Sequence, residues 1–166
     1  MPIPSVDPTA KSLPRRLAVN AVRTRFGKWV LREVSPRLDP PLLRLSRGRL
    51  SSTLVTPGLL LTTTGAKSGL ERATPLTYFT DGDRVILMAS NYGGTRHPGW
   101  YYNIKAHPEV SATAAGYQGR FIAEEVTGAE RDRLWSLAKQ FIASYGDYEL
   151  TAGHREIPIV ALSPVG

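Results

Sequence analysis

The sequence predicts a mainly β protein in which short antiparallel strands form a small barrel flanked by helices. Three observations indicate this fold class. Short apolar or β-branched runs recur along residues 51–166, turns rich in glycine or proline separate them, and strands and helices alternate too irregularly for a parallel sheet. At 166 residues, of which 42% are hydrophobic, the chain can bury the core of one domain. We expect residues 51–166 to form this domain, residues 1–14 to be a disordered or extended arm, and residues 15–50 to be helical.

Apolar side chains recur on one side of a helical period in the N-terminal segment, over residues 15–34. They are Val19, Val22, Phe26, Trp29 and Val30. The opposite side carries basic residues such as Arg25, Lys28 and Arg32. One interpretation is an amphipathic helix docked on the domain. The other, which stays open, is a helix that faces an anionic membrane surface or a substrate entrance.

The first half of the domain reads as three strands. Gly58–Thr64 is apolar and β-branched, and residues 72–80 form a second run that contains Pro75. A proline inside a strand indicates either a bulge or an edge position. The tight turn at residues 81–83 then leads into a buried strand over residues 84–89.

The second half begins with a short helix over residues 98–105, which has Pro98 near its first turn. A hairpin follows, with strands 110–115 and 119–126 around a turn at residues 116–118. Thr127 and Glu130 have the spacing of a capping box, so we expect one helix from Thr127 to about Tyr145. Residues 157–162 close the domain as a strand.

Composition narrows the classes of function. The chain has no cysteine, which excludes disulfides, thiolate nucleophiles and iron–sulfur clusters. It has three histidines without paired spacing, so we expect no metal site. No run of apolar residues is long enough to span a membrane, and no secretory signal is visible, so we expect a cytoplasmic protein.

The basic charge of the chain lies almost wholly in its N-terminal segment. Residues 1–50 hold eleven Lys and Arg against three acids, whereas the rest holds ten basic and eleven acidic residues. A basic barrel that binds nucleic acid therefore stays only as an alternative, and such a binder would lose affinity steeply with salt. We expect no nucleic acid as partner.

Three segments carry residues suited to binding or chemistry. The turn Gly65–Gly69 combines two glycines with Lys67 and is followed by Arg72, so its N–H groups and cations are suited to an anion; a solvated hairpin loop is the alternative. Ser90 ends a buried strand just before a glycine pair. Residues 100–102 are three consecutive aromatics, which cannot all face the core.

In this order, the segments resemble the deazaflavin-dependent nitroreductase family, whose members are also called deazaflavin-dependent quinone reductases. The resemblance begins at Leu60–Gly69 and continues through Ala89-Ser90, Gly93-Gly94 and Trp100–Pro108 to Arg155–Val160. It covers roughly residues 55–164 and implies a split antiparallel β-barrel related to FMN-binding barrels. It also implies reduced coenzyme F-420 as hydride donor, and a quinone, enone or nitro compound as acceptor.

The resemblance also assigns site residues. Those expected at the coenzyme, a deazaflavin with a ribityl phosphate and an oligoglutamate tail, are Lys67, Ser68, Gly69, Arg72, Pro75, Leu76, Met88, Ala89, Ser90, Asn91, Trp100 and Asn103. We expect Ser90 to donate a hydrogen bond to the acceptor, with Tyr145 and Tyr148 as pocket walls or proton sources. Packing at a helix end is the alternative for the two tyrosines. A barrel that binds FMN or a haem-derived ligand is the alternative for the whole site.

The sequence departs from the family pattern at two places. Relatives often have a lysine directly after the serine that matches Ser90, whereas Asn91 and Tyr92 stand here, so Tyr92 is expected to cover the site instead. Relatives also present a tyrosine where this chain has Ile142. A more apolar pocket follows, which fits nitroimidazole-type acceptors less well.

Overall fold

The computed structural model describes residues 3–9 and 57–165, which contain six strands and three α-helices. The predicted antiparallel barrel with flanking helices is confirmed in this part of the chain. The predicted amphipathic helix over residues 15–34, and the rest of the 15–50 segment, lie outside the described residues. No helix among the described residues is long and apolar enough to cross a membrane.

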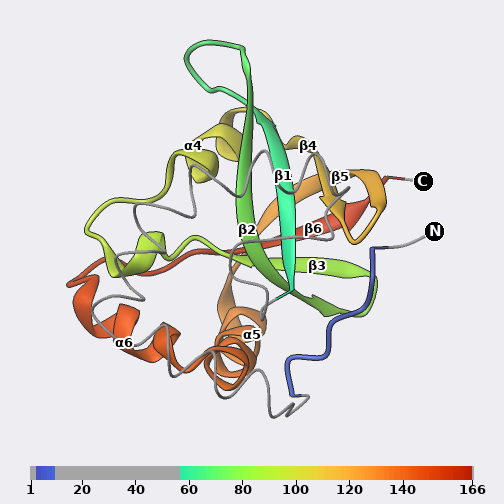
Figure 1. The fold of residues 1–166 in the computed structure, drawn as a ribbon. Helices are drawn as coiled ribbons and strands as arrows, with labels where there is room; N and C mark the ends of the chain where they lie inside the picture. Colours follow the sequence, from blue (N-terminus) through green and yellow to red (C-terminus); the bar gives the residue numbers. More distant parts are fainter. Residues whose placement is uncertain (1–2, 10–56, 166) are drawn as a thin grey trace, which may run out of the picture.

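The six strands form a closed antiparallel barrel in the order β1-β2-β3-β6-β5-β4 (Figure 1). Their bounds are β1 Gly58–Thr64, β2 Glu71–Asp81, β3 Arg84–Met88, β4 Glu109–Ala114, β5 Tyr117–Val126 and β6 Ile159–Pro164. Pairing of β1 with β4, with Leu61 opposite Ala112, closes the barrel. β6 inserts between β3 and β5.

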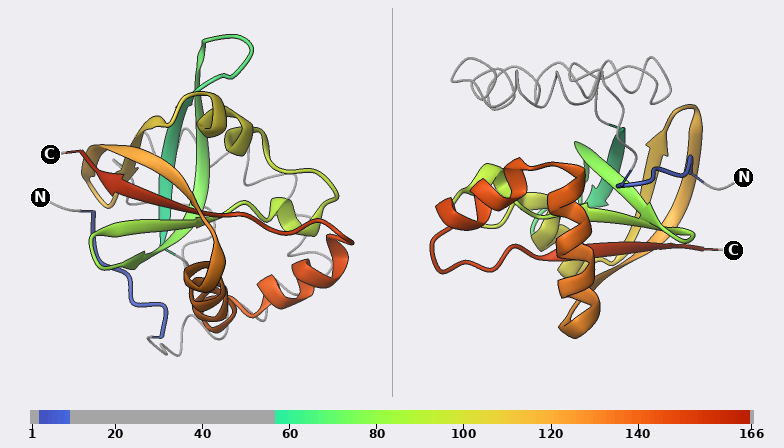
Figure 2. Two further views of the ribbon diagram at one scale, coloured as in Figure 1. Left: turned by 180° about the vertical axis from the view of Figure 1, so that it is seen from behind. Right: turned by 90° about the horizontal axis from the view of Figure 1, so that it is seen from below.

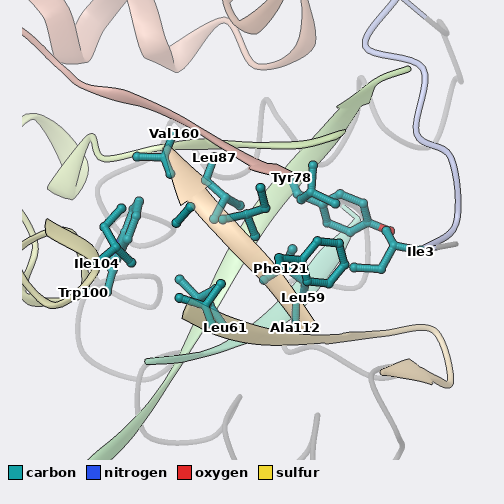
Figure 3. Packing of buried hydrophobic residues seen from close by; sticks show 14 of the residues in the cluster. Ile3, Leu59, Leu61, Tyr78, Leu87, Trp100, Ile104, Ala112, Phe121 and Val160 are labelled. Atoms are coloured by element: carbon teal, nitrogen blue, oxygen red, sulfur yellow. The ribbon is translucent and has the colours of Figure 1, made fainter. Parts of the chain in front are cut away.

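Alternation along the central strands separates two apolar clusters. On β3, Val85 and Leu87 face a cluster inside the barrel, whereas Ile86 and Met88 face a second cluster shared with α5 and α6. Because both faces of β3 are covered, its sequence is a continuous apolar run rather than an alternating one. Figure 3 shows the inner cluster, with Trp100 on one side and Ile3 on the other.

Pro75 occupies an edge position within β2. It lies opposite Leu60 of β1, and the pairing of β2 with β3 is confined to Tyr78–Asp81. Among the described residues, Pro75 therefore has a paired strand on one side only, and its missing N–H interrupts no second ladder. Of the two predicted explanations for this proline, the edge position is confirmed.

The three helices are α4 Gly99–Ala106, α5 Gly128–Phe141 and α6 Ser144–Thr151. The prediction of one helix from Thr127 to about Tyr145 is wrong, because the β-branched Ile142 adopts an extended conformation with φ −136° and ψ 106°. Figure 2 shows that α5 and α6 run in different directions. The break lets α6 pack against the loop after β3 instead of continuing along α5.

Local details correct the predicted ends of α5 and of the β4–β5 hairpin. Thr127 is the N-cap residue of α5 but forms no capping bond with its side chain, because Gly128 follows at φ +65° and Glu130 pairs with Arg84 instead. The hairpin turn is the pair Ala115 and Gly116, both at positive φ, so residues 117 and 118 belong to β5.

The final strand begins two residues later than predicted. β6 starts at Ile159, because the preceding residue, Pro158, has no N–H to donate to a strand ladder. The carbonyl of Pro158 instead accepts a hydrogen bond from Ala89 N–H at 2.9 Å, at the point where β3 ends. This contact joins the start of the last strand to the loop that carries Ser90.

Residues 3–9 run along the end of β2. Ile3 is 7% exposed and belongs to the inner cluster. The Tyr78 hydroxyl donates to the carbonyl of Pro4 at 3.2 Å, and Thr80 N–H donates to the carbonyl of Val6 at 3.0 Å. This segment therefore contributes both apolar contacts and hydrogen bonds to the barrel.

Candidate functional site

The segments singled out in the sequence follow one side of the barrel. Figure 1 shows the β1–β2 turn projecting beyond the strands, with α4 below it, then the loop after β3, and then α6. The loop contains a short 3-10 turn, η2 Asn91–Gly93, which packs against α6.

The β1–β2 turn is tied to α4 through one side chain, Asn103. Its Oδ1 accepts from Ala66 N–H, and its Nδ2 donates to the Thr63 hydroxyl, both at 3.0 Å. Asn103 thus bridges Thr63, near the end of β1, and Ala66, in the turn. Because the amide uses its acceptor and one of its donors on the protein, Asn103 holds the turn in place relative to α4.

Part of the backbone of the turn is hydrogen-bonded within the hairpin. Gly65 N–H donates to Leu70 O at 2.9 Å, Gly69 N–H to Gly65 O at 2.8 Å, and Leu70 N–H to Ser68 Oγ at 3.4 Å. Gly69 is at φ +66°, as a tight turn requires. These bonds hold the shape of the turn that carries Lys67.

Lys67 and Arg72 are the cations available at the turn. Both are exposed, and neither forms an ion pair with any residue in the described part of the chain. Arg72 lies on β2 opposite Thr63, next to the Asn103 bridge. Two exposed cations without a carboxylate partner among the described residues have the charge that suits an anionic group.

The loop after β3 has a left-handed bend. Asn91, Tyr92 and Gly93 have φ values of 47°, 54° and 74° in succession. Left-handed residues other than glycine cost free energy, and they concentrate where the surrounding structure holds them for a function. The Ser90 side chain directly before the bend is half-buried, and its hydroxyl forms no hydrogen bond with the described residues.

Arg155 holds this loop from the segment between α6 and β6. Its Nε donates to Gly94 O at 2.9 Å, its Nη2 to Ser90 O at 2.7 Å, and its Nη1 to Ala89 O at 3.2 Å. Nη1 also lies 3.0 Å from His97 Nδ1. Since a guanidinium only donates, Nδ1 accepts and the imidazole proton is on Nε2. Burial, followed by the charge of Arg155, lowers the pKa of His97.

Tyr145 and Tyr148 lie on α6 beside this loop. Their ring centroids are 6.0 Å apart, and the Tyr148 ring meets Tyr92 edge-on at 6.4 Å. Burial raises the pKa of Tyr148 to about 12 and also raises the pKa of Tyr145. Both hydroxyls therefore stay protonated near neutral pH and keep a proton that can be donated in a hydrogen bond. Neither forms a hydrogen bond with another described residue.

The remaining predicted residues lie in the barrel wall or core. Pro75 and Leu76 are half-buried on β2, whereas Met88 and Ala89 are buried at the end of β3. Trp100 is 5% exposed and packs into the inner cluster, and Tyr102 of the same helix is 50% exposed. The expectation that residues 100–102 cannot all face the core is confirmed.

Sequence reasoning missed Arg155 as a site residue. The arginine was visible only as part of a C-terminal motif, and no local pattern links it to a loop 65 residues away. Within residues 3–9 and 57–165, no group of three His, Asp or Glu side chains could hold a metal ion. The candidate ligand-binding groups are thus two cations at the turn and the hydroxyls of serine and tyrosine side chains beside α6. This combination fits an organic anion with a polar ring system.

A closed antiparallel barrel with an exposed cationic turn, and with Ser90 and two tyrosines close to one loop, fits the class of proteins that bind an anionic organic cofactor. The family model of the F420H(2)-dependent quinone reductases matches residues 37–164, and the chain belongs to this family. An F420H(2)-dependent quinone reductase of Mycobacterium tuberculosis is 36% identical over 146 residues, which are 83% of this chain and 97% of that protein.

Solved structures agree with this assignment. A structure described as an F420-H2 dependent reductase is 36% identical, with a TM-score of 0.60, and the match covers 64% of this chain and 94% of that chain. A second, described as a domain-swapped dimer, is 33% identical, with a TM-score of 0.61, and the match covers 75% of this chain and 94% of that chain. The fold and the family predicted from the sequence are confirmed.

Proposed function

We propose that this protein transfers a hydride from reduced coenzyme F-420 to a quinone-type acceptor. The observation that carries the proposal is the exposed pair Lys67 and Arg72 on a turn fixed to α4 by Asn103. Two cations without ionic partners among the described residues suit the oligoglutamate tail and the phosphate of this coenzyme. When bound, the coenzyme supplies the hydride from its reduced deazaflavin ring.

The proposed roles of the other residues follow from their positions. Pro75, Leu76, Met88, Ala89, Ser90 and Asn91 would border the ring and the ribityl chain. Trp100 and Asn103 would support the phosphate side, and Ser68 and Gly69 belong to the turn that carries Lys67. The Ser90 hydroxyl, which has no partner among the described residues, would donate a hydrogen bond to the acceptor oxygen and stabilise the negative charge that develops there. Tyr145 and Tyr148 would form the pocket wall and donate further hydrogen bonds.

The proposal is tested by titrating the protein with coenzyme F-420 while tryptophan fluorescence is recorded. Lys67→Ala with Arg72→Ala should weaken binding by roughly thirtyfold to ten-thousandfold, since each of the two charge-assisted contacts contributes about 1–3 kcal/mol. Arg120→Ala, which removes another exposed cation from β5, should leave the affinity unchanged. Unchanged affinity of the double variant would contradict the site assignment. Titrations with FMN and with haem run in parallel, and tight binding of FMN alone would contradict the choice of cofactor.

We further propose that nitro compounds are poorer acceptors than quinones and that residues 15–34 bring the protein to anionic membrane surfaces. The first point is supported by Ile142, and the second by the basic charge of residues 1–50. Co-sedimentation with anionic and with neutral vesicles tests the membrane association. The full chain should bind only the anionic vesicles, and Arg25→Glu with Lys28→Glu should abolish this binding.

Turnover of naphthoquinone and nitroimidazole acceptors, compared at equal concentrations, tests the acceptor preference.

A further inference from the structure

Arg155 is unusual among the charged residues of the domain because its guanidinium N–H groups donate mainly to main-chain carbonyl oxygens. Three of its hydrogen bonds go to carbonyls of one loop, those of Ala89, Ser90 and Gly94, at 2.7–3.2 Å. It forms no ion pair with a described carboxylate. Arg131, a comparably buried arginine nearby, pairs instead with Glu156 and donates to only one carbonyl, that of Ile157.

The loop that Arg155 contacts needs such support. Asn91 and Tyr92 both have left-handed backbones, which side chains with a Cβ rarely adopt. On its other side the loop lies directly on α6: a Cβ built on Gly93 would be 3.1 Å from Tyr148 Cα and would overlap Thr151 Oγ1. The bend is therefore held between Arg155 and the backbone of α6.

We propose that Arg155 is a positioning residue whose guanidinium holds the Ala89–Gly94 backbone in its left-handed bend and thereby fixes the direction of the Ser90 hydroxyl. The proposal rests on the function proposed for Ser90. Arg155 Nη2 bonds the carbonyl of Ser90 itself, and Nε and Nη1 bond the residues on either side of the bend. The planar guanidinium of an arginine can donate to all three carbonyls at once, whereas the single side-chain nitrogen of a lysine cannot reach all three oxygens.

The first measurement is amide hydrogen exchange on Arg155→Ala and Arg155→Lys. Gly93 N–H donates to Ser90 O at 3.0 Å and Gly94 N–H to Asn91 O at 2.9 Å, so these amides report on the bend. Both variants should exchange them at least tenfold faster, whereas the amides of Gly65 and Gly69 in the other turn should be unchanged. Arg131→Ala is the matched control and should leave all four unchanged. Unchanged exchange at Gly93 and Gly94 would overturn the proposal.

The second measurement is steady-state reduction of a small naphthoquinone by reduced coenzyme F-420. If Arg155 positions Ser90, kcat should fall at least tenfold in both Arg155 variants, with a smaller change in KM for the quinone. Millimolar guanidinium should restore part of the kcat of Arg155→Ala, and ammonium should not. Because Arg155→Lys keeps the charge and most of the volume, it keeps the test decisive if Arg155→Ala fails to fold.

The two measurements separate the possible failures. Faster exchange with unchanged kcat would show that Arg155 holds the loop without serving catalysis, and would overturn the positioning role. Wild-type protein that neither binds coenzyme F-420 nor reduces the quinone would overturn the proposed function. In that case the exchange rates would still decide whether Arg155 holds the bend.

Discussion

At the scale of the residue, burial sets the protonation state of the two tyrosines of α6, Tyr145 and Tyr148. An ordinary tyrosine hydroxyl ionises near pH 10, but burial beside Tyr92 and Asp147 raises the pKa of Tyr148 to about 12. A hydroxyl that stays neutral can line a pocket for an apolar quinone without bringing a charge. The same burial makes the folded state sensitive to alkali.

This gives a prediction about pH. The folded protein keeps a proton on Tyr148 that the unfolded chain loses, so stability is full below pH 10 and falls as the pH rises toward 12. As the pH rises through this range, the free energy of unfolding should fall by about 1–2 kcal/mol less for Tyr148→Phe than for the wild type. Urea unfolding at pH 9, 10 and 11 measures the difference. Tyr102→Phe, at an exposed position, should follow the wild type, and equal slopes for all three proteins would refute the prediction.

At the scale of the element, charged side chains join α5 to the β2–β3 hairpin. Asp81 accepts from Arg133 at 2.7 Å and 2.9 Å and from Arg84 at 2.9 Å, and Arg84 also pairs with Glu130. Hydrogen bonding from Arg133, and then from Arg84, lowers the pKa of Asp81. The same Glu130 that the sequence suggested as a capping residue is therefore part of an ion-pair network.

Asp81→Asn should weaken this junction. At pH 7 we expect the free energy of unfolding to fall by about 1 kcal/mol, a modest value because the side chains are partly exposed. Since the folded pKa lies below the ordinary value of 3.8, the contribution of Asp81 is present above that pH and is lost as the pH falls further. Denaturant unfolding at pH 7 and at pH 3 measures this. Between these two pH values, the free energy of unfolding should change less for the variant than for the wild type. Asp132→Asn, at an 80% exposed position, is the control, and an equal effect there would argue against the network.

At the scale of the whole molecule, two segments that are far apart in the sequence and lie outside the six strands complete the inner cluster. α4 contributes Trp100 and Ile104, residues 3–9 contribute Ile3, and Figure 3 places Trp100 and Ile3 on opposite sides of the cluster. Ile3→Ala should lower the free energy of unfolding by about 2–4 kcal/mol, because it removes buried methyl groups and leaves a cavity. Thermal and urea unfolding measure this. Val165→Ala, at a 45% exposed position, should cost less than about 0.5 kcal/mol, and similar costs for both would mean that Ile3 is not packed as described.

The sequence predicted what depends on neighbours along the chain. The strand Gly58–Thr64 was predicted with its observed bounds, because its apolar residues and flanking Pro57 and Gly65 are local signals. The break at Ile142 was missed, because it depends on packing of α6 against a loop far away in the sequence. The Arg155 contacts were missed for the same reason, as they form only when the barrel brings the two segments together.

The place of β6 in the barrel has a consequence for how the protein is made. Ile159–Pro164 pairs with both β3 and β5, so the strand that joins the two halves of the sheet is the last one to be synthesised among those described. During synthesis, the edges of β3 and β5 that later pair with β6 have no strand partner until Pro164 has left the ribosomal exit tunnel. Such late, long-range pairing slows folding and exposes nascent chains to aggregation. We therefore expect closure of the barrel, which needs β6 between β3 and β5, to be a late step in folding.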